Sequence, residues 1–131
     1  MDKINQTILK LLRKNGRMSW QDIGKQVNMT GQAVSARVQL MEHKGVISGY
    51  TIKEDALERH YITVFMNDGR FDAFEKFIKT DERIESAHKV TGEGCYQLVL
   101  ASNQPKALEL FLDELSRFAR QKVSSVIRKI K

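Results

Sequence analysis

The first 45 residues carry apolar side chains at intervals of three and four, which is the spacing of amphipathic helices. The pattern predicts a first helix over residues 2–14, ended by the pair Asn15-Gly16. Ser19 and the acid three residues after it are typical of a capping box and predict the start of a second helix. Thr30 is a good N-cap for a third helix, which Lys44-Gly45 ends. The buried stripe expected on this third helix consists of Val34, Val38 and Met41.

The period of the pattern changes after Gly45. Residues 46–52 are rich in β-branched and aromatic side chains and predict an extended segment, the wing of a winged helix-turn-helix. The residues that follow are polar and charged, so residues 51–60 are expected to form a linker. The chain then consists of a helical domain over residues 1–50 and a second domain over residues 61–131.

The second domain alternates strand and helix patterns. Strands are expected over residues 61–66, 84–91, 95–101 and 123–130, and amphipathic helices over 71–78 and 108–118. Gly92-Glu93-Gly94 predicts a hairpin turn between the two middle strands. The order βαββαβ is the ferredoxin-like arrangement, so the expected fold class is α+β. A unit of about 70 residues with one open sheet face is marginally stable alone, which favours dimerisation through the sheet.

Basic residues are concentrated in the first domain. Residues 1–50 contain eight Lys and Arg against three Asp and Glu, whereas residues 51–131 contain fourteen against thirteen. A positive module joined to a nearly neutral one is typical of polyanion binding, with a merely solvated basic surface as the alternative. The sequence has no run of 18 apolar residues and no signal-peptide core, so neither a membrane span nor secretion is expected. The lone Cys95 allows no internal disulfide, and the chain is expected in the cytoplasm.

The second and third helices, joined by a short turn, predict a helix-turn-helix, which places its second helix in the major groove of double-stranded DNA. That helix needs short polar side chains, and a glutamine amide can both donate to and accept from adenine. The residues expected to contact bases are Gly31, Gln32, Ser35, Ala36 and Gln39. The residues expected to contact phosphates are Lys14, Arg17 and Lys25. Arg37 lies at the edge of the buried stripe, where it either reaches a phosphate or packs its stem against the core. The alternative is a three-helix bundle with a solvated polar face.

Several runs of sequence carry a family resemblance. In the first domain they are Ile8-Leu9-Lys10-Leu11-Leu12, Gly16-Arg17-Met18-Ser19, Asp22-Ile23-Gly24, Val34-Ser35-Ala36-Arg37-Val38, Glu42-His43-Lys44-Gly45-Val46-Ile47 and Gly49-Tyr50. In the second they are Val90-Thr91-Gly92 and Cys95-Tyr96. Together they resemble the leucine-responsive/asparagine-type (Lrp/AsnC) regulators along nearly the whole chain. The resemblance implies a nucleoid-associated transcription regulator with an N-terminal helix-turn-helix. It also implies a C-terminal βαββαβ (RAM-type) domain that dimerises and often builds octamers.

The resemblance further implies a small amino-acid effector bound between dimers. The corresponding effector-loop positions are Thr91, Gly92, Glu93, Gly94 and Cys95. Relatives commonly have an acidic residue where this sequence has Cys95, and a thiol holds a ligand ammonium less strongly than a carboxylate does. Glu93 is the alternative acid, although it stands in a turn. Leu40 is a second departure, because relatives often have a basic residue there.

Three other functions remain open from the sequence. An architectural protein that bends DNA without an effector fits the missing acid at position 95. A siroheme decarboxylase shares the two-domain layout, but only His60 and His88 are candidates for binding a tetrapyrrole. A sensor that acts through a protein partner needs no DNA. The basic first domain favours a non-enzymatic regulator without cofactor or metal, which binds DNA as a dimer or higher oligomer.

Overall fold

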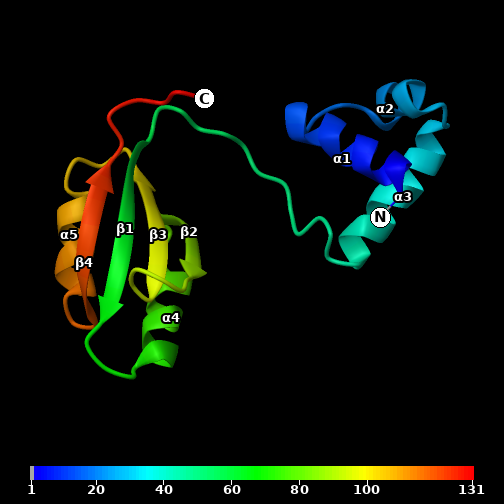
Figure 1. The fold of residues 1–131 in the computed structure, drawn as a ribbon. Coiled ribbons are helices and arrows are strands. Elements are labelled where there is room, and N and C mark those ends of the chain that lie inside the picture. The colour runs from blue at the N-terminus through cyan, green and yellow to red at the C-terminus, as the bar shows by residue number, and fades with distance from the viewer. Residues whose placement is uncertain (1) are drawn as a thin grey trace. The chain divides into compact units, whose positions relative to one another are not determined.

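The computed structural model describes residues 2–131 and contains two compact units, the first ending at Lys53 and the second beginning at Glu54 (Figure 1). Each unit has its own hydrophobic core. Among the described residues, no helix has both the length and the apolar character needed to cross a membrane.

The first unit consists of three helices, α1 (Lys3–Lys14), α2 (Trp20–Val27) and α3 (Gly31–His43). Each helix begins at a side-chain cap, because Asp2, Ser19 and Thr30 accept a hydrogen bond from the backbone N–H three residues later. The helices bury one apolar residue of α1, one of α2 and three of α3: Ile8, Ile23, Val34, Val38 and Met41. The helix starts expected at Ser19 and Thr30 are confirmed, and so is the buried stripe of α3.

The turn between α2 and α3 depends on close backbone packing. Asn28 takes the left-handed conformation (φ 55°), and the N–H of Met29 donates to the carbonyl of Gly24 at 2.9 Å. A Cβ atom at Gly24 would lie 2.3 Å from the carbonyl oxygen of Met29, so no larger residue fits there without moving the turn. This contact fixes the short connection that a helix-turn-helix requires.

The wing strand expected over residues 46–52 does not form. The N–H groups of Val46 and Ile47 both donate to the carbonyl of Met41, so they close the end of α3 rather than pair with a strand. The described part of the first unit contains no other strand that could pair with this segment. Residues 48–53 therefore have no regular secondary structure, and Ile52 is 73% exposed.

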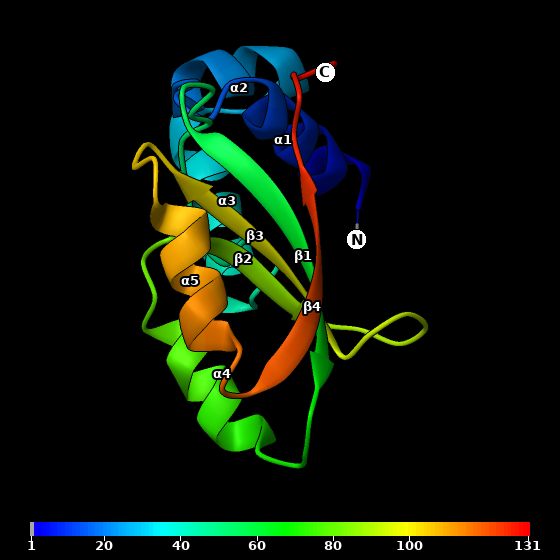
Figure 2. The ribbon, with the colours of Figure 1, turned by 90° about the vertical axis from the view of Figure 1, so that its left-hand side faces the viewer.

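The second unit has the order β1 (Glu58–Met66), α4 (Phe71–Lys79), β2 (Ile84–Lys89), β3 (Tyr96–Ser102), α5 (Ala107–Leu115) and β4 (Ala119–Ser125). The four strands form one antiparallel sheet in the order β2-β3-β1-β4. Both helices cover the same face of the sheet (Figure 2). This arrangement confirms the expected α+β, ferredoxin-like fold.

All four strands differ in their bounds from the sequence pattern, and β1 and β4 differ most. β1 begins at Glu58, inside the expected linker, because Glu58 to His60 pair with the end of β3. β4 spans Ala119–Ser125 instead of 123–130, because those residues pair with β1 as far as His60. The charged residues that alternate along β4 make its sequence unlike that of a typical strand. The apolar residues of the C-terminal tail favoured a strand that the structure does not contain, and Ile127 there is 97% exposed.

The core of the second unit lies between the sheet and the two helices. Ile62, Val64, Leu98 and Leu100 point from the central strands toward the helices, where Phe74 and Phe111 are fully buried. Because side chains alternate along a strand, the neighbouring residues of β1 and β3 face the other side of the sheet. That open face, and the turn between β2 and β3 at its edge, remain available for binding.

Candidate nucleic-acid interface and effector loop

The predicted base-contacting residues of α3 do not all have the same surroundings. Gln32, Ala36 and Gln39 are exposed, whereas Gly31 and Ser35 are half-buried. A Cβ at Gly31 would lie 3.3 Å from the backbone nitrogen of Gln21, so Gly31 allows the start of α3 to approach α2. Gly31 therefore serves packing within the unit, and the residues with accessible polar groups are Gln32, Ser35 and Gln39.

Two of these side chains are joined to each other. The Gln39 amide nitrogen donates to the Ser35 hydroxyl at 3.2 Å, one helical turn away. This bond uses one of the two amide hydrogens of Gln39 and leaves its second hydrogen and its carbonyl oxygen unused. The amide is thereby orientated while it keeps one donor and one acceptor, the pair that adenine requires in the major groove.

Arg37 is held within the first unit. Its guanidinium lies 2.8 Å from the Asp2 carboxylate and donates to the Asn5 side-chain oxygen at 3.1 Å. The backbone N–H of Asn5 and the Arg37 guanidinium together hold the pKa of Asp2 below its ordinary value. The sequence left two roles open for Arg37, a phosphate contact or packing within the unit. The geometry favours the second, because Arg37 connects α3 to the start of α1.

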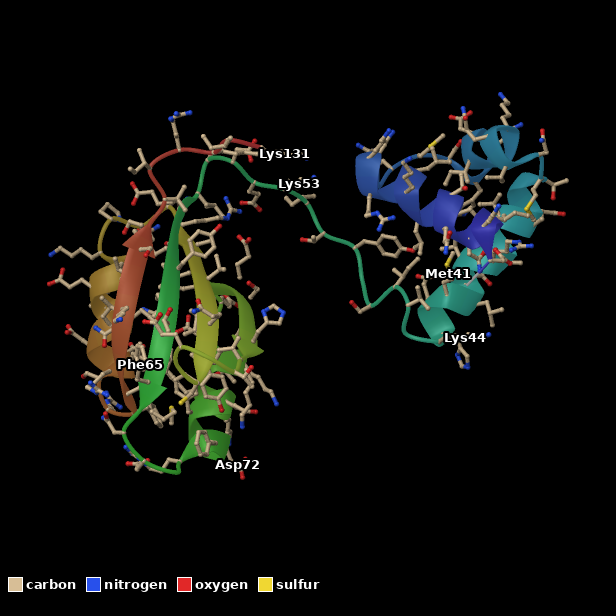
Figure 3. The ribbon with its side chains drawn as sticks, in the orientation of Figure 1. Met41, Lys44, Lys53, Phe65, Asp72 and Lys131 are labelled. Carbon is tan, nitrogen blue, oxygen red and sulfur yellow. The ribbon has the colours of Figure 1, made fainter. Side chains whose placement is uncertain are left out.

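The predicted phosphate-contacting residues Lys14, Arg17 and Lys25 are all exposed. Lys25 lies 3.9 Å from Asp22 in a weak pair across one turn of α2, and 72% of its side chain is exposed. Lys14 is the last residue of α1. Arg17 lies in the loop that follows, and its backbone N–H donates to the side-chain oxygen of Asn15. Lys44 caps the far end of α3, three residues after buried Met41 (Figure 3), and sequence reasoning assigned it only a terminating role.

Trp20 is not part of the buried core of the first unit. It is the first residue of α2, and 37% of its surface is exposed. Its main chain lies beside Gly31, since a Cβ there would be 3.5 Å from the Trp20 carbonyl carbon. Ile23, three residues later, is fully buried, so α2 contacts the core after its first residue.

The predicted effector loop folds back on the central strand. Gly92 and Gly94 both have positive φ, and a Cβ at Gly94 would lie 2.6 Å from the Thr63 methyl carbon. The N–H of Cys95 donates to the carbonyl of Val64 at 2.7 Å. Glycine is therefore required where the loop meets β1, and this contact fixes the position of the loop on the sheet.

The one acidic side chain of that loop is already paired. The Glu93 carboxylate accepts a hydrogen bond from the Lys122 ammonium of β4 at 2.7 Å. Thr91 is exposed and Cys95 is half-buried. The loop therefore combines a thiol with a carboxylate that a basic neighbour partly neutralises.

The open face of the sheet is partly apolar. Tyr61 is 50% exposed, and Phe65 (labelled in Figure 3) lies beneath the charged ends of Arg120 and Lys122 at 5.9 and 5.8 Å. Gln97 donates to Thr63 at 2.7 Å across the centre of this face. Aromatic rings surrounded by polar groups on an uncovered sheet are typical of a protein–protein interface.

The histidines are not arranged as ligands. The strand register places His88 opposite Gln97, and His60 makes a 2.7 Å hydrogen bond with Ser125. Within residues 2–131, no three His, Cys, Asp or Glu side chains come together as a metal-binding group. The geometry does not bring His60 and His88 together as candidates for binding a tetrapyrrole either, because they lie on β1 and β2 with β3 between them.

Comparison with protein families gives a match in each unit. Residues 1–42 match the AsnC-type helix-turn-helix domain, and residues 59–131 match the Lrp/AsnC ligand binding domain. The HTH-type transcriptional regulator LrpB of Bacillus subtilis is 35% identical over 136 residues, which span 100% of this chain and 91% of that protein. The leucine-responsive regulatory protein of Escherichia coli is 32% identical over 109 residues, which span 75% of this chain and 65% of that protein.

Solved structures share the fold at lower identity. LrpC of B. subtilis has a TM-score of 0.86 and 23% identity, covering 100% of this chain and 97% of that one. A transcriptional regulator from Neisseria meningitidis in complex with L-Met has a TM-score of 0.81 and 23% identity, covering 100% and 92%. Both units therefore have the folds found in these structures.

Proposed function

The chain belongs to the Lrp/AsnC family of helix-turn-helix transcriptional regulators, and from that premise we propose how it recognises DNA and how it is controlled. As in its relatives, the first unit binds double-stranded DNA, and the protein is a regulator rather than an enzyme. The siroheme decarboxylase alternative is thereby removed. A regulator of this kind works in the cytoplasm with the nucleoid, and that location is part of the proposal.

Gln39 is proposed as the principal base-contacting residue of α3, with Gln32 and Ala36 beside it. The observation that carries this assignment is the Ser35–Gln39 hydrogen bond, which leaves one donor and one acceptor of the amide free on an exposed surface. A bidentate contact with adenine contributes about 1–3 kcal/mol of discrimination against other bases. Lys14, Arg17 and Lys25 supply the phosphate contacts that position the helix.

The second unit is proposed to join two chains and to receive a small amino acid. The open face around Tyr61 and Phe65 supports a dimer formed sheet against sheet, and further association to an octamer is the family's usual extension. Relatives are named as leucine-responsive or as bound to L-Met, which supports an apolar amino acid as the effector. The loop from Thr91 to Cys95, at the edge of this face, is where such a ligand was expected from the sequence.

The test of DNA recognition is a selection of bound fragments from random DNA, followed by gel shifts on the selected site. The Gln39→Ala variant is expected to lose preference at one A·T pair in each half-site while it keeps binding to unselected DNA. Gln6→Ala on the exposed side of α1 is the matched control. A Gln39→Ala variant with an unchanged selected motif would show that this residue does not contact bases.

The same measurements separate the remaining alternatives. An architectural protein without an effector would bind DNA identically with and without an amino-acid mixture. A DNA-binding protein gives measurable binding at low salt through its phosphate contacts alone. A sensor that acts only through a protein partner has no such contacts, so it would give no shifted DNA at any salt concentration. Binding that falls with salt and changes with the mixture supports the effector-controlled regulator.

A further inference from the structure

A large apolar side chain lies on the exposed surface of α3. Leu40 is 50% exposed, whereas the other large apolar side chains of this helix, Val34, Val38 and Met41, are buried. Leu40 directly precedes Met41 (labelled in Figure 3), so it is rotated by about 100° from that buried residue around the helix axis. A single exposed leucine is ordinary on a protein surface, so the residues beside it decide what its exposure indicates.

Leu40 shares the exposed face of α3 with the residues proposed to contact bases. Ala36 lies one turn before it, and side chains four residues apart lie on the same face of a helix. Ala36 is exposed as well, so the two side chains form an apolar surface that we call the Ala36–Leu40 strip. Gln39 is rotated by about 100° from Leu40, so its amide and the strip lie side by side along the helix.

The segment that follows α3 leaves the Ala36–Leu40 strip uncovered. The N–H groups of Val46 and Ile47 both donate to the carbonyl of Met41, and the Ile47 side chain packs against the core of the first unit. The chain therefore returns to the buried side of α3 where the helix ends. Neither Ala36 nor Leu40 packs against that core, so the strip faces away from it.

The chemistry of the strip determines which partner it fits. α3 is the second helix of a helix-turn-helix, and such domains place this helix in the major groove. There, thymine is the base that presents a methyl group, at its C5 position, and apolar side chains contact that methyl. An aliphatic side chain offers a phosphate neither charge nor a hydrogen bond, so the strip fits a base edge rather than the DNA backbone. Its place beside the Gln39 amide makes it part of the same DNA-facing surface.

We propose that Leu40, with Ala36 beside it, contacts the 5-methyl group of a thymine in each half-site that the protein binds. Gln39 then recognises an adenine through hydrogen bonds, while Leu40 recognises a thymine through apolar contact. This inference rests on the base contacts of α3 put forward under Proposed function, and it adds a second base and a second kind of contact. Position 40 is also one at which the sequence departs from its family, so the contact is a property of this chain.

The test replaces the thymines of the selected DNA site, one at a time, by deoxyuridine. This change removes the methyl group, keeps the base pair and leaves the protein unaltered. Fluorescence anisotropy with the full-length protein then measures the affinity for each duplex. One thymine in each half-site is expected to respond with a loss of about threefold to fivefold, which corresponds to one methyl group left unburied. A selected site in which no thymine responds overturns the proposal.

Variants of Leu40 assign the methyl contact to this residue. Leu40→Ala is expected to bind the responsive thymine and deoxyuridine duplexes equally, whereas Leu40→Met keeps an apolar side chain of similar size and should keep the preference. Leu110→Ala is the matched control, because Leu110 is a leucine of α5 that is 53% exposed, and it should keep the preference as well. A deoxyuridine effect that persists in Leu40→Ala would show that the methyl group acts through the shape of the DNA, which overturns the proposal.

Two further measurements test other surroundings for Leu40. Leu40→Lys is expected to abolish the preference for thymine over deoxyuridine. If position 40 faces a phosphate instead, this variant steepens the salt dependence of binding and leaves the thymine preference unchanged. If Leu40 lies between two copies of the chain, Leu40→Ala changes the mass measured by light scattering and again leaves the preference unchanged. Either result overturns the proposal.

The outcomes separate this inference from the proposed function. If Gln39→Ala loses its preference for an A·T pair while no deoxyuridine duplex binds more weakly, the contact proposed for Gln39 stands and only that of Leu40 is overturned. If the unmodified protein selects no preferred site from random DNA, the proposed base recognition and this inference are both overturned. A thymine preference that disappears in Leu40→Ala and remains in Leu40→Met and Leu110→Ala supports the methyl contact.

Discussion

The two units differ in what their basic side chains contact. In the second unit, Arg59, Arg70, Arg83, Lys122 and Lys129 all lie within 3.1 Å of a carboxylate oxygen. Among residues 2–53 only Lys25 and Arg37 form such pairs, and that of Lys25 is 3.9 Å long. Seven of the nine Lys and Arg side chains of the first unit therefore form no ion pair within the described chain, whereas five of the thirteen in the second unit are paired, all of them closely.

This difference matters more than the net charge of either unit. A cation that is paired in the free protein must separate from its partner before it can contact a phosphate, whereas an unpaired cation only releases counterions from DNA. Exposed ion pairs themselves stabilise a fold by only about 0–1 kcal/mol. The unpaired cations of the first unit should therefore affect DNA binding without affecting stability, and the pair between Arg83 and the largely buried Asp81 in the second unit should do the opposite.

The largest effect is expected from Arg83→Met in the second unit. Arg83 pairs with Asp81 and with Glu114 at 2.7 Å each and lies over the Phe111 ring at 5.5 Å. The Asp81 side chain is only 8% exposed, so removing Arg83 leaves a largely buried carboxylate without its partner. We expect a loss of about 2 kcal/mol in the free energy of unfolding, measured by urea denaturation.

The control for that variant is Arg59→Met. Its partner Glu85 is 45% exposed and remains solvated when the pair is broken, so a loss below about 1 kcal/mol is expected. Equal losses in the two variants would contradict the distinction between buried and exposed pairs.

The second effect in size is expected from the double variant Lys14→Gln, Arg17→Gln in the first unit. Both side chains are exposed, and neither forms an ion pair among the described residues. Affinity for DNA is expected to fall at least tenfold near physiological salt. The slope of log K against log salt, measured by fluorescence anisotropy, should become shallower by about 1 for each phosphate that the variant no longer neutralises.

Lys76→Gln is the matched control for the double variant, because Lys76 is an exposed lysine of α4 in the second unit. It should leave both the affinity and the salt slope unchanged, and the thermal midpoint of the double variant should match that of the unmodified protein. An equal drop in affinity in the control would mean that DNA binding depends on the net charge of the whole chain rather than on these two residues.

A smaller effect is expected when the pH is lowered. Burial alone would raise the pKa of Asp81, but the side-chain and backbone hydrogen bonds from Arg83 hold it below the ordinary value of 3.8. A depressed folded-state pKa gives stability that is present above the unfolded pKa and is lost as the pH falls through the folded one. Urea denaturation of the second unit between pH 6 and pH 3 should therefore show declining stability below about pH 4. The decline should be smaller in Arg83→Met.

The same contrast explains what the sequence could predict. The caps at Ser19 and Thr30 and the buried stripe of α3 depend on residues three or four positions apart, so the local pattern is sufficient. The Arg37–Asp2 pair joins residues 35 positions apart, and Glu93–Lys122 joins residues 29 apart. Nothing in the spacing of either pair indicates that the fold brings them together.

The predicted ends of the strands were wrong for a related reason. The expected strand over 123–130 was based on apolar residues, but a strand ends where its partner ends, and β1 offers no partner beyond Ser125 apart from one bond from Val126. The expected wing had β-branched residues and no partner at all within the described first unit. Pairing is a property of the whole sheet, which a single segment does not encode.

The smallest effect is expected from Ser35→Ala on α3. Ser35 is half-buried and holds the Gln39 amide at 3.2 Å, so the variant leaves Gln39 in place but free to adopt other rotamers. Ordering that side chain on DNA then costs additional entropy, and affinity for the selected site should fall by about 0.5–1 kcal/mol, or roughly twofold to fivefold. A double-mutant cycle decides whether Ser35 acts through Gln39 or by itself. If it acts only through Gln39, Ser35→Ala has no further effect in a Gln39→Ala background; if the two effects add, Ser35 makes its own contact with DNA.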